Sequence, residues 1–208
     1  MTRAEAEVEP LDARRAFEAA GVLARAFDDN PATLAIFAGA SAEQRKRGLL
    51  RAIQAFVDIS WRHGTCEVLL RSGRVVAVAL SFGPGAYPPP IAAQLGMSVR
   101  VARTGMPSTL RYLRVGEYMQ RLHPRAPHWY LFFLGVEPSL QGSGLGSQLL
   151  ARLTARADRD GVIGYLETDR EANLRLYERH GFRIVSDGVL PKVNDLRLWT
   201  MQRPQSDS

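Results

Sequence analysis

The stretch from Trp129 to Ala157 constrains the fold more than any other part of the chain. Residues 129–134 (WYLFFL) are almost wholly apolar and aromatic, which suits a strand buried on both faces. A glycine-containing loop follows, and apolar residues then recur at helical spacing: Leu149, Leu150, Leu153 and Ala157. The pattern predicts a strand, a loop at its carboxyl end and a helix that begins near Gly146.

The loop contains three alternating glycines, Gly142, Gly144 and Gly146, which leave the backbone bare at the start of the predicted helix. The first N–H groups of a helix have no intrahelical partner, and the aligned peptide dipoles place roughly half a positive charge there. A Cβ at these positions would hold a phosphate away from the amides. We therefore predict a pyrophosphate-binding loop; the alternative is a flexible strand-to-helix turn.

The composition predicts one soluble globular domain. The chain has 208 residues, of which 46% are hydrophobic, and no run approaches the roughly 20 apolar residues that span a membrane. Acidic residues stand near the N-terminus where a secretory signal has an apolar segment, so we predict a cytoplasmic protein without membrane association. Cys66 is the only cysteine, and the four histidines lack ligand spacing with carboxylates. We expect Cys66 in the core and no metal.

The charge of the chain favours a small anionic ligand over nucleic acid. The formal net charge is +6 and the pI is near 10.0, but the arginines are scattered among acidic residues and form no block. A mildly basic surface equally serves a nucleotide-containing cofactor. We therefore predict no nucleic-acid partner.

Periodicity and turn residues predict the remaining elements. Residues 1–10 are expected to be loosely ordered, residues 11–203 to form a single domain, and residues 204–208 to form a tail. Ser41 and Gln44 have capping-box spacing, as do Thr168 and Glu171. Helices are predicted over 13–27, 41–63, 91–103, 108–123 and 172–180, and strands over 67–70, 75–82, 162–168, 182–186 and 196–201.

This order of elements, with Gln141, Gly144 and Gly146 after the apolar strand, resembles the GCN5-related N-acetyltransferase (GNAT) superfamily. The loop matches the family pattern Gln/Arg-x-x-Gly-x-Gly/Ala, and Asn173 and Tyr177 follow in the expected order. Residues 128–131, 142–147 and 165–168 resemble the puromycin N-acetyltransferase-like branch. The resemblance covers about residues 128–201 and fades before them.

The resemblance implies a mixed α/β fold whose central sheet splays between its fourth and fifth strands, with helices on both faces and a cofactor-binding core at about 128–182. It implies acetyl-CoA as donor. Leu134, Gly135 and Val136 would present backbone groups to the pantetheine arm. The pyrophosphate would bind the loop Gln141, Gly142, Ser143, Gly144, Leu145, Gly146 and Ser147. Ser143 replaces a basic residue that is common in the family.

Tyr177 is the predicted catalytic residue, because the family's tyrosine at this place assists the departing thiolate. Asn173 precedes it by one helical turn, so both are expected to face the cofactor. A base must also take a proton from the amine. Glu167, at the end of the fifth strand, is the tentative candidate, and Asp29 is a second that would contact the substrate. His123 and His128 flank the start of the fourth strand and are further imidazoles to consider.

Two other functions compete with acetyl transfer. A Rossmann-type nucleotide or S-adenosylmethionine enzyme also joins a strand to a helix through glycines, and Glu167 would then bind a ribose. A non-catalytic acyl-CoA sensor would keep the loop without needing Tyr177. Under the acetyltransferase interpretation the acceptor is predicted to be a small-molecule amine framed by the first two helices and residues 83–123. A homodimer is possible.

Overall fold

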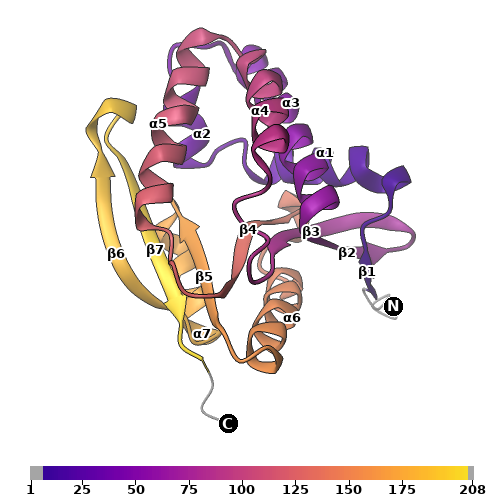
Figure 1. Ribbon diagram of the computed structural model, residues 1–208. Coiled ribbons are helices and arrows are strands. Elements are labelled where there is room, and N and C mark those ends of the chain that lie inside the picture. Colours follow the sequence, from indigo (N-terminus) through magenta and orange to yellow (C-terminus); the bar gives the residue numbers. More distant parts are fainter. Residues whose placement is uncertain (1–6, 206–208) are drawn as a thin grey trace.

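A seven-stranded mixed sheet forms the centre of the computed structural model, which describes residues 7–205 (Figure 1). The strand order is β1-β2-β3-β4-β5-β7-β6. Neighbouring strands are antiparallel except β4 and β5, which are parallel. The strands are β1 (Glu7–Pro10), β2 (Thr65–Arg71), β3 (Arg74–Phe82), β4 (His128–Val136), β5 (Ile163–Thr168), β6 (Arg183–Leu190) and β7 (Leu196–Arg203).

Helices cover both faces of this sheet. Figure 1 shows the first five helices above the sheet and the last two below it. The first group is α1 (Ala16–Ala26), α2 (Pro31–Ile36), α3 (Ala42–His63), α4 (Ile91–Ala102) and α5 (Met106–Leu122); the second is α6 (Leu145–Arg159) and α7 (Leu174–Arg179). Two apolar clusters, one containing residues of α1 and α3 and the other residues of α6, fill the opposite faces. The predicted fold class is confirmed.

The parallel pair β4–β5 opens partway along its length. His128 to Leu131 pair with Ile163 to Leu166, and the pairing then stops, although β4 continues to pair with β3 up to Val136. The second half of β4 therefore has a free edge beside β5. One parallel pair in an otherwise antiparallel sheet also contradicts the Rossmann-type alternative, which needs repeated parallel strands.

Local sequence rules account for most elements. The Ser41 hydroxyl accepts a hydrogen bond from Gln44 N at 3.2 Å, and the Gln44 side chain accepts one from Ser41 N at 2.9 Å, so the predicted capping box starts α3. The predicted hairpin is β2–β3. Gly181 has a φ of 83° just after α7, as expected for a left-handed cap.

Three predictions about elements are wrong. Residues 7–10, expected to be loosely ordered, form the edge strand β1, while residues 1–6 and 206–208 lie outside the described part. Pro31, expected only to end a helix, is at the first turn of α2, where its missing N–H costs nothing. The Thr168 capping box does not form, because Thr168 Oγ1 accepts from Arg170 N and α7 begins only at Leu174.

A buried ion-pair cluster fixes α6 against the sheet. Glu67 of β2 is buried and accepts hydrogen bonds from Arg152 Nε at 2.6 Å and from Arg156 Nη1 at 2.7 Å. Burial raises the pKa of Glu67, but the hydrogen bonds and charges of the two arginines outweigh it and lower the pKa overall. The neighbouring Cys66 is buried, as predicted, and burial raises its pKa to about 12. Within residues 7–205 no helix combines the length and apolar character needed to cross a membrane.

Candidate active site

A small cavity lies where β4 separates from β5. Its volume is about 50 Å³. It brings together four predicted site residues from separate elements: Leu134 on β4, Glu167 on β5, Asn173 before α7, and Tyr177 on α7. The other lining residues are Phe27, Asn30, Leu131, Phe132, Phe133, Thr168 and Asp169. The chain thus places an acidic group, an amide and a phenol around one space with aromatic walls.

The glycine loop adjoins the same strand and has the geometry of an anion site. Gly142 and Gly144 have φ values of 76° and 88°, which disfavour any residue with a Cβ. A Cβ at either position would meet no atom within 4 Å, so both face open space. The loop backbone is therefore accessible to a ligand at these two residues.

The first turn of α6 offers free amides. Gln148 N donates to Gly144 O at 3.1 Å, and the N–H groups of Leu145, Gly146 and Ser147 precede this hydrogen bond. No side chain caps this end of α6. The positive end of the helix dipole and these N–H groups suit a phosphate.

Two polar side chains of the glycine loop form hydrogen bonds with backbone carbonyls of the loop and of the end of β4. Gln141 Nε2 donates to Val136 O at 3.3 Å, and the Ser143 hydroxyl donates to Leu140 O. Ser147 Oγ lies within hydrogen-bond distance of His180 Nε2, a partner that the sequence pattern did not indicate. Leu145 is buried in the core. An anion would therefore bind the backbone of this loop.

Gly135 of β4 is required by packing. A Cβ there would lie 2.7 Å from Leu23 Cδ2 of α1, which is too close for two carbon atoms. Its neighbours Leu134 and Val136 lie on the free edge of β4, beyond the last residue paired with β5. The predicted backbone contacts of these three residues are thus compatible with the strand's position.

Tyr177 is buried at one side of the cavity. Burial raises its pKa above the usual value of about 10, and the Asp169 carboxylate raises it further. The hydroxyl therefore stays protonated at neutral pH. It can donate a hydrogen bond but is a weak proton donor.

Hydrogen bonds connect the loop after β5 to the start of α2, and the sequence analysis did not predict this contact. Asp169 accepts hydrogen bonds from Asn30 Nδ2 at 3.1 Å and from Ala32 N at 2.7 Å. Asp29 does not line the cavity: its side chain is 76% exposed and pairs with Arg170 Nη2 at 2.7 Å. The adjacent residue Asn30 lines the cavity, whereas Asp29, the predicted substrate contact, lies outside it.

Glu167 carries the buried acidic group of the cavity. Its side chain is only 3% exposed, and the nearest cation-forming group is His123, with Nδ1 at 3.9 Å from Oε1. Tyr130 lies on the adjoining strand β4 and Tyr165 on β5 itself; burial raises the pKa of both hydroxyls, and the Glu167 carboxylate raises it further. These tyrosines therefore stay neutral around the carboxylate.

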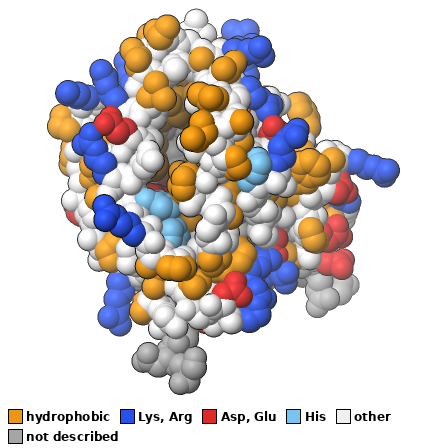
Figure 2. All heavy atoms as spheres, viewed as in Figure 1, with side chains coloured by type: hydrophobic (Ala, Val, Ile, Leu, Met, Phe, Trp, Pro, Cys, Tyr) orange, Lys and Arg blue, Asp and Glu red, His pale blue; other side chains and the backbone are white. Residues whose placement is uncertain are grey.

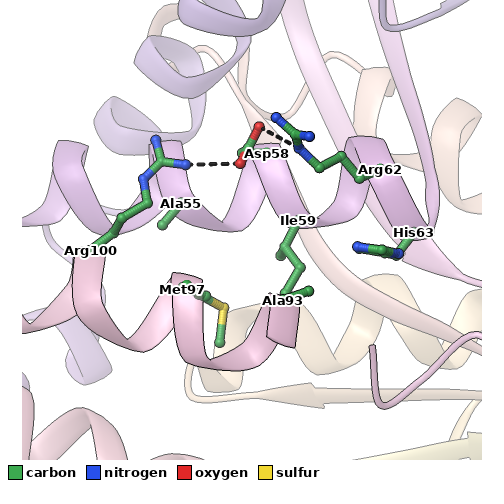
Figure 3. A pocket seen from close by; sticks show the side chains of 9 residues that line it. Ala55, Asp58, Ile59, Arg62, His63, Ala93, Met97 and Arg100 are labelled. Atoms are coloured by element: carbon green, nitrogen blue, oxygen red, sulfur yellow. Dashed lines mark hydrogen bonds and ion pairs between the residues drawn. The ribbon is translucent and has the colours of Figure 1, made fainter. Parts of the chain in front are cut away.

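A larger cavity of about 330 Å³ lies between α3 and α4 and contains none of the predicted site residues (Figure 3). Its lining includes His63 and also Asp58, which pairs with Arg62 at 3.1 Å and with Arg100 at 2.9 Å. The Asp58 carboxylate is therefore already paired with two cations.

Hydrophobic side chains gather over α4 and α5, around a hollow in the face shown in Figure 2. The exposed residues there include Ile91, Leu95 and Val99 on α4 and Met106 and Leu110 on α5. These helices belong to the region 83–123, which the sequence predicted to frame the substrate.

Comparisons with known proteins agree with this geometry. The Acetyltransferase (GNAT) family profile matches residues 55–182. A mycothiol acetyltransferase of Brachybacterium faecium is 39% identical over 57 residues, covering 26% of this chain and 17% of the relative. N-alpha-acetyltransferase RimI of Mycobacterium tuberculosis is 40% identical over 77 residues, covering 36% of this chain and 48% of the relative. The chain thus spans less than half the length of both relatives.

Among solved structures, the histone acetyltransferase HPA2 and related acetyltransferase from Corynebacterium glutamicum has a TM-score of 0.72. It is 24% identical, and the match covers 98% of each chain. At this identity the likeness concerns the fold.

Proposed function

Because the chain belongs to the acetyltransferase (GNAT) family and is an N-acetyltransferase, we propose that it transfers the acetyl group of acetyl-CoA to a primary amine of a small molecule. The amine would attack the thioester directly, with both substrates bound together. One observation carries the proposal: Glu167, Asn173 and Tyr177 surround the cavity where β4 leaves β5, beside the free amides of α6.

The residues present fit acetyl-CoA. The amides of Leu145, Gly146 and Ser147 suit the pyrophosphate, which can approach closely because Gly142 and Gly144 lack a Cβ. The edge of β4 at Leu134 to Val136 suits the pantetheine amides, which would pair with it as an added strand does. Bound acetyl-CoA would supply the electrophilic thioester carbonyl. Gln141 and Ser143 would support this site by holding the loop, and Asn173 by lining the cavity.

Tyr177 would stabilise charge on the departing sulphur. A tyrosine with a pKa of about 10 is already a weaker acid than a thiol of about 8.5, and its pKa is raised further in this protein. Full proton transfer from Tyr177 is therefore unfavourable. A hydrogen bond from its hydroxyl to the developing thiolate needs no such transfer.

The acceptor amine must lose a proton before it can attack. An alkylammonium with a pKa of about 10.4 costs roughly 4.6 kcal/mol to deprotonate at pH 7, at about 1.36 kcal/mol per unit. Two carboxylates line the cavity, and Glu167 would receive this proton, because Asp169 already accepts hydrogen bonds from Asn30 and Ala32. Phe132 and Phe133 would contact the body of the amine, and the carboxylate its cationic head.

A thiol-release assay with a panel of amines tests this function. We expect free CoA to appear only when acetyl-CoA and a suitable amine are both present, with an N-acetylated product in equal amount. Small alkylamines and arylalkylamines should be better acceptors than peptides with a free N-terminus, because the cavity is narrow and aromatic. Saturable acetyl-CoA binding without transfer to any amine would instead indicate the sensor function.

A further inference from the structure

Two histidines form a short chain of contacts that ends at Glu167. His123 follows the last residue of α5, and His128 is the first residue of β4. Their Nε2 atoms lie 2.9 Å apart. At the end away from Glu167, His128 Nδ1 lies 2.7 Å from Ala126 O. At the other end, His123 Nδ1 lies 3.9 Å from Glu167 Oε1.

The backbone carbonyl of Ala126 fixes the protons along this chain. A carbonyl oxygen only accepts, so His128 Nδ1 carries the hydrogen of that contact. In neutral His128 the Nε2 atom is then an acceptor, and His123 Nε2 must donate to it. The remaining ring nitrogen, His123 Nδ1, therefore presents a lone pair toward Glu167.

A lone pair and a carboxylate oxygen thus face each other without a proton. Glu167 Oε1 is buried and accepts no hydrogen bond of regular geometry within residues 7–205, although the Tyr130 and Tyr165 hydroxyls lie close enough to interact with the carboxylate. Such a buried acceptor is costly when it is left unpaired. One added proton on His123 Nδ1 would place a cation 3.9 Å from Glu167 Oε1, which is an ion-pair distance.

We propose that His123 and Glu167 form a proton-accepting pair for the acceptor amine, with His128 as the positioning residue that sets the tautomer of His123. This rests on the proposed function. An N–H bond of the acceptor ammonium breaks, its electron pair stays on nitrogen, and the proton forms a new N–H bond at His123 Nδ1, whose positive charge then faces Glu167 Oε1. The amine becomes a neutral nucleophile, and the pair later returns its proton to water.

The aromatic surroundings of His123 favour a proton transfer that leaves no net charge on the pair and the amine. The rings of Tyr87, Tyr130 and Tyr165 lie 4.6, 4.9 and 4.9 Å from the ring of His123. Before transfer the carboxylate and the ammonium are opposite charges, and after it His123 and Glu167 together are neutral beside a neutral amine. The transfer therefore adds no net charge to this aromatic enclosure.

The pH dependence follows from His128. Burial lowers the pKa of His128 below its usual value of about 6.5, although the Ala126 contact and the Glu167 charge oppose this. The groups that face the two histidines are Glu167 and Tyr165 on β5, Tyr130 on β4, and Tyr87 before α4. Protonated His128 donates hydrogen bonds from both ring nitrogens, so His123 Nε2 must accept from it. The proton of neutral His123 is then on Nδ1, and this nitrogen can no longer accept a proton from the amine. Activity should fall as the pH drops through this transition.

The decisive experiment compares two acceptors that differ mainly in amine pKa. The first is the best primary alkylamine from the thiol-release assay, and the second is its β,β-difluoro analogue, whose amine is far less basic and therefore much less protonated at neutral pH. H123Q should lower kcat/KM by about 10²-fold for the alkylamine, the range expected for lost general-base catalysis. It should lower kcat/KM much less for the analogue. A structural role of His123 would give equal losses for both acceptors and would overturn the proposal.

The matched control is H63Q, which changes a histidine that lines the cavity between α3 and α4. It should leave kcat/KM unchanged for both acceptors. Nitrogen-15 NMR of the wild-type imidazoles gives a test that needs neither a variant nor an acceptor: His128 should carry its proton on Nδ1 and His123 on Nε2. A proton on Nδ1 of His123 at neutral pH would refute the pair. An absence of transfer to any amine would instead refute the proposed function.

Discussion

Replacing Tyr177 with Phe is expected to lower kcat by about 10²-fold, the typical cost of removing one hydrogen-bond donor from developing negative charge. Tyr177 lines the cavity beside the free edge of β4, and the raised pKa of its hydroxyl keeps it protonated. Since the donor would act on the departing sulphur, acetyl-CoA affinity should change little. Steady-state kinetics and calorimetric titration of acetyl-CoA measure the two quantities separately.

A suitable control for this variant is Tyr112→Phe. Tyr112 is a largely buried tyrosine of α5 that packs against Phe37 and Phe56, and burial raises its pKa as well. This substitution should leave kcat unchanged, which separates the loss of a buried hydroxyl from the loss of this particular one. Equal losses of acetyl-CoA affinity and kcat in Tyr177→Phe would contradict the role given to Tyr177.

Replacing Gly144 with Ala should weaken acetyl-CoA binding by about tenfold or more, which corresponds to at least about 1.4 kcal/mol. Gly144 has a φ of 88° and precedes the first helical residue of α6. The added Cβ meets no protein atom within 4 Å, but it projects from the loop that must approach the pyrophosphate. Calorimetric titration of acetyl-CoA gives the change in Kd directly.

Gly73→Ala provides the matched control for backbone strain. Gly73 lies in the turn between β2 and β3, has a φ of 75°, and also has no atom within 4 Å of its Cβ position. Both variants should lose about 1–2 kcal/mol of stability, because an L-residue is strained at positive φ. Only Gly144→Ala should lose acetyl-CoA affinity. Unchanged affinity in Gly144→Ala would mean that the anion binds elsewhere.

The proposed cofactor side of the site could be located in the sequence because its determinants are local. A buried strand, three alternating glycines and an amphipathic helix occupy one continuous stretch, and each has a physical rule of its own. Gly142 and Gly144 have positive φ angles, which are unfavourable for residues with a Cβ, so glycine is expected at both positions. Asn173 and Tyr177, four residues apart, likewise line one cavity.

The contact between His123 and Glu167, two residues that the sequence analysis considered separately, escaped prediction because it joins distant segments. His123 and Glu167 are 44 positions apart, and only the placement of α5 over the sheet brings them together. Asp169 likewise binds Asn30 and Ala32, which lie more than 130 positions away in the sequence. Strand β1 has only four residues and contains charges and a proline, so its pairing with β2 depends on the rest of the sheet.

A crystal structure of the protein with acetyl-CoA tests the central claim most directly. The account predicts the pyrophosphate against the amides of Leu145, Gly146 and Ser147, and the thioester in the opening between β4 and β5, facing Tyr177. Acetyl-CoA bound in the cavity between α3 and α4, or no bound acetyl-CoA at a concentration that saturates the enzyme assay, would contradict it.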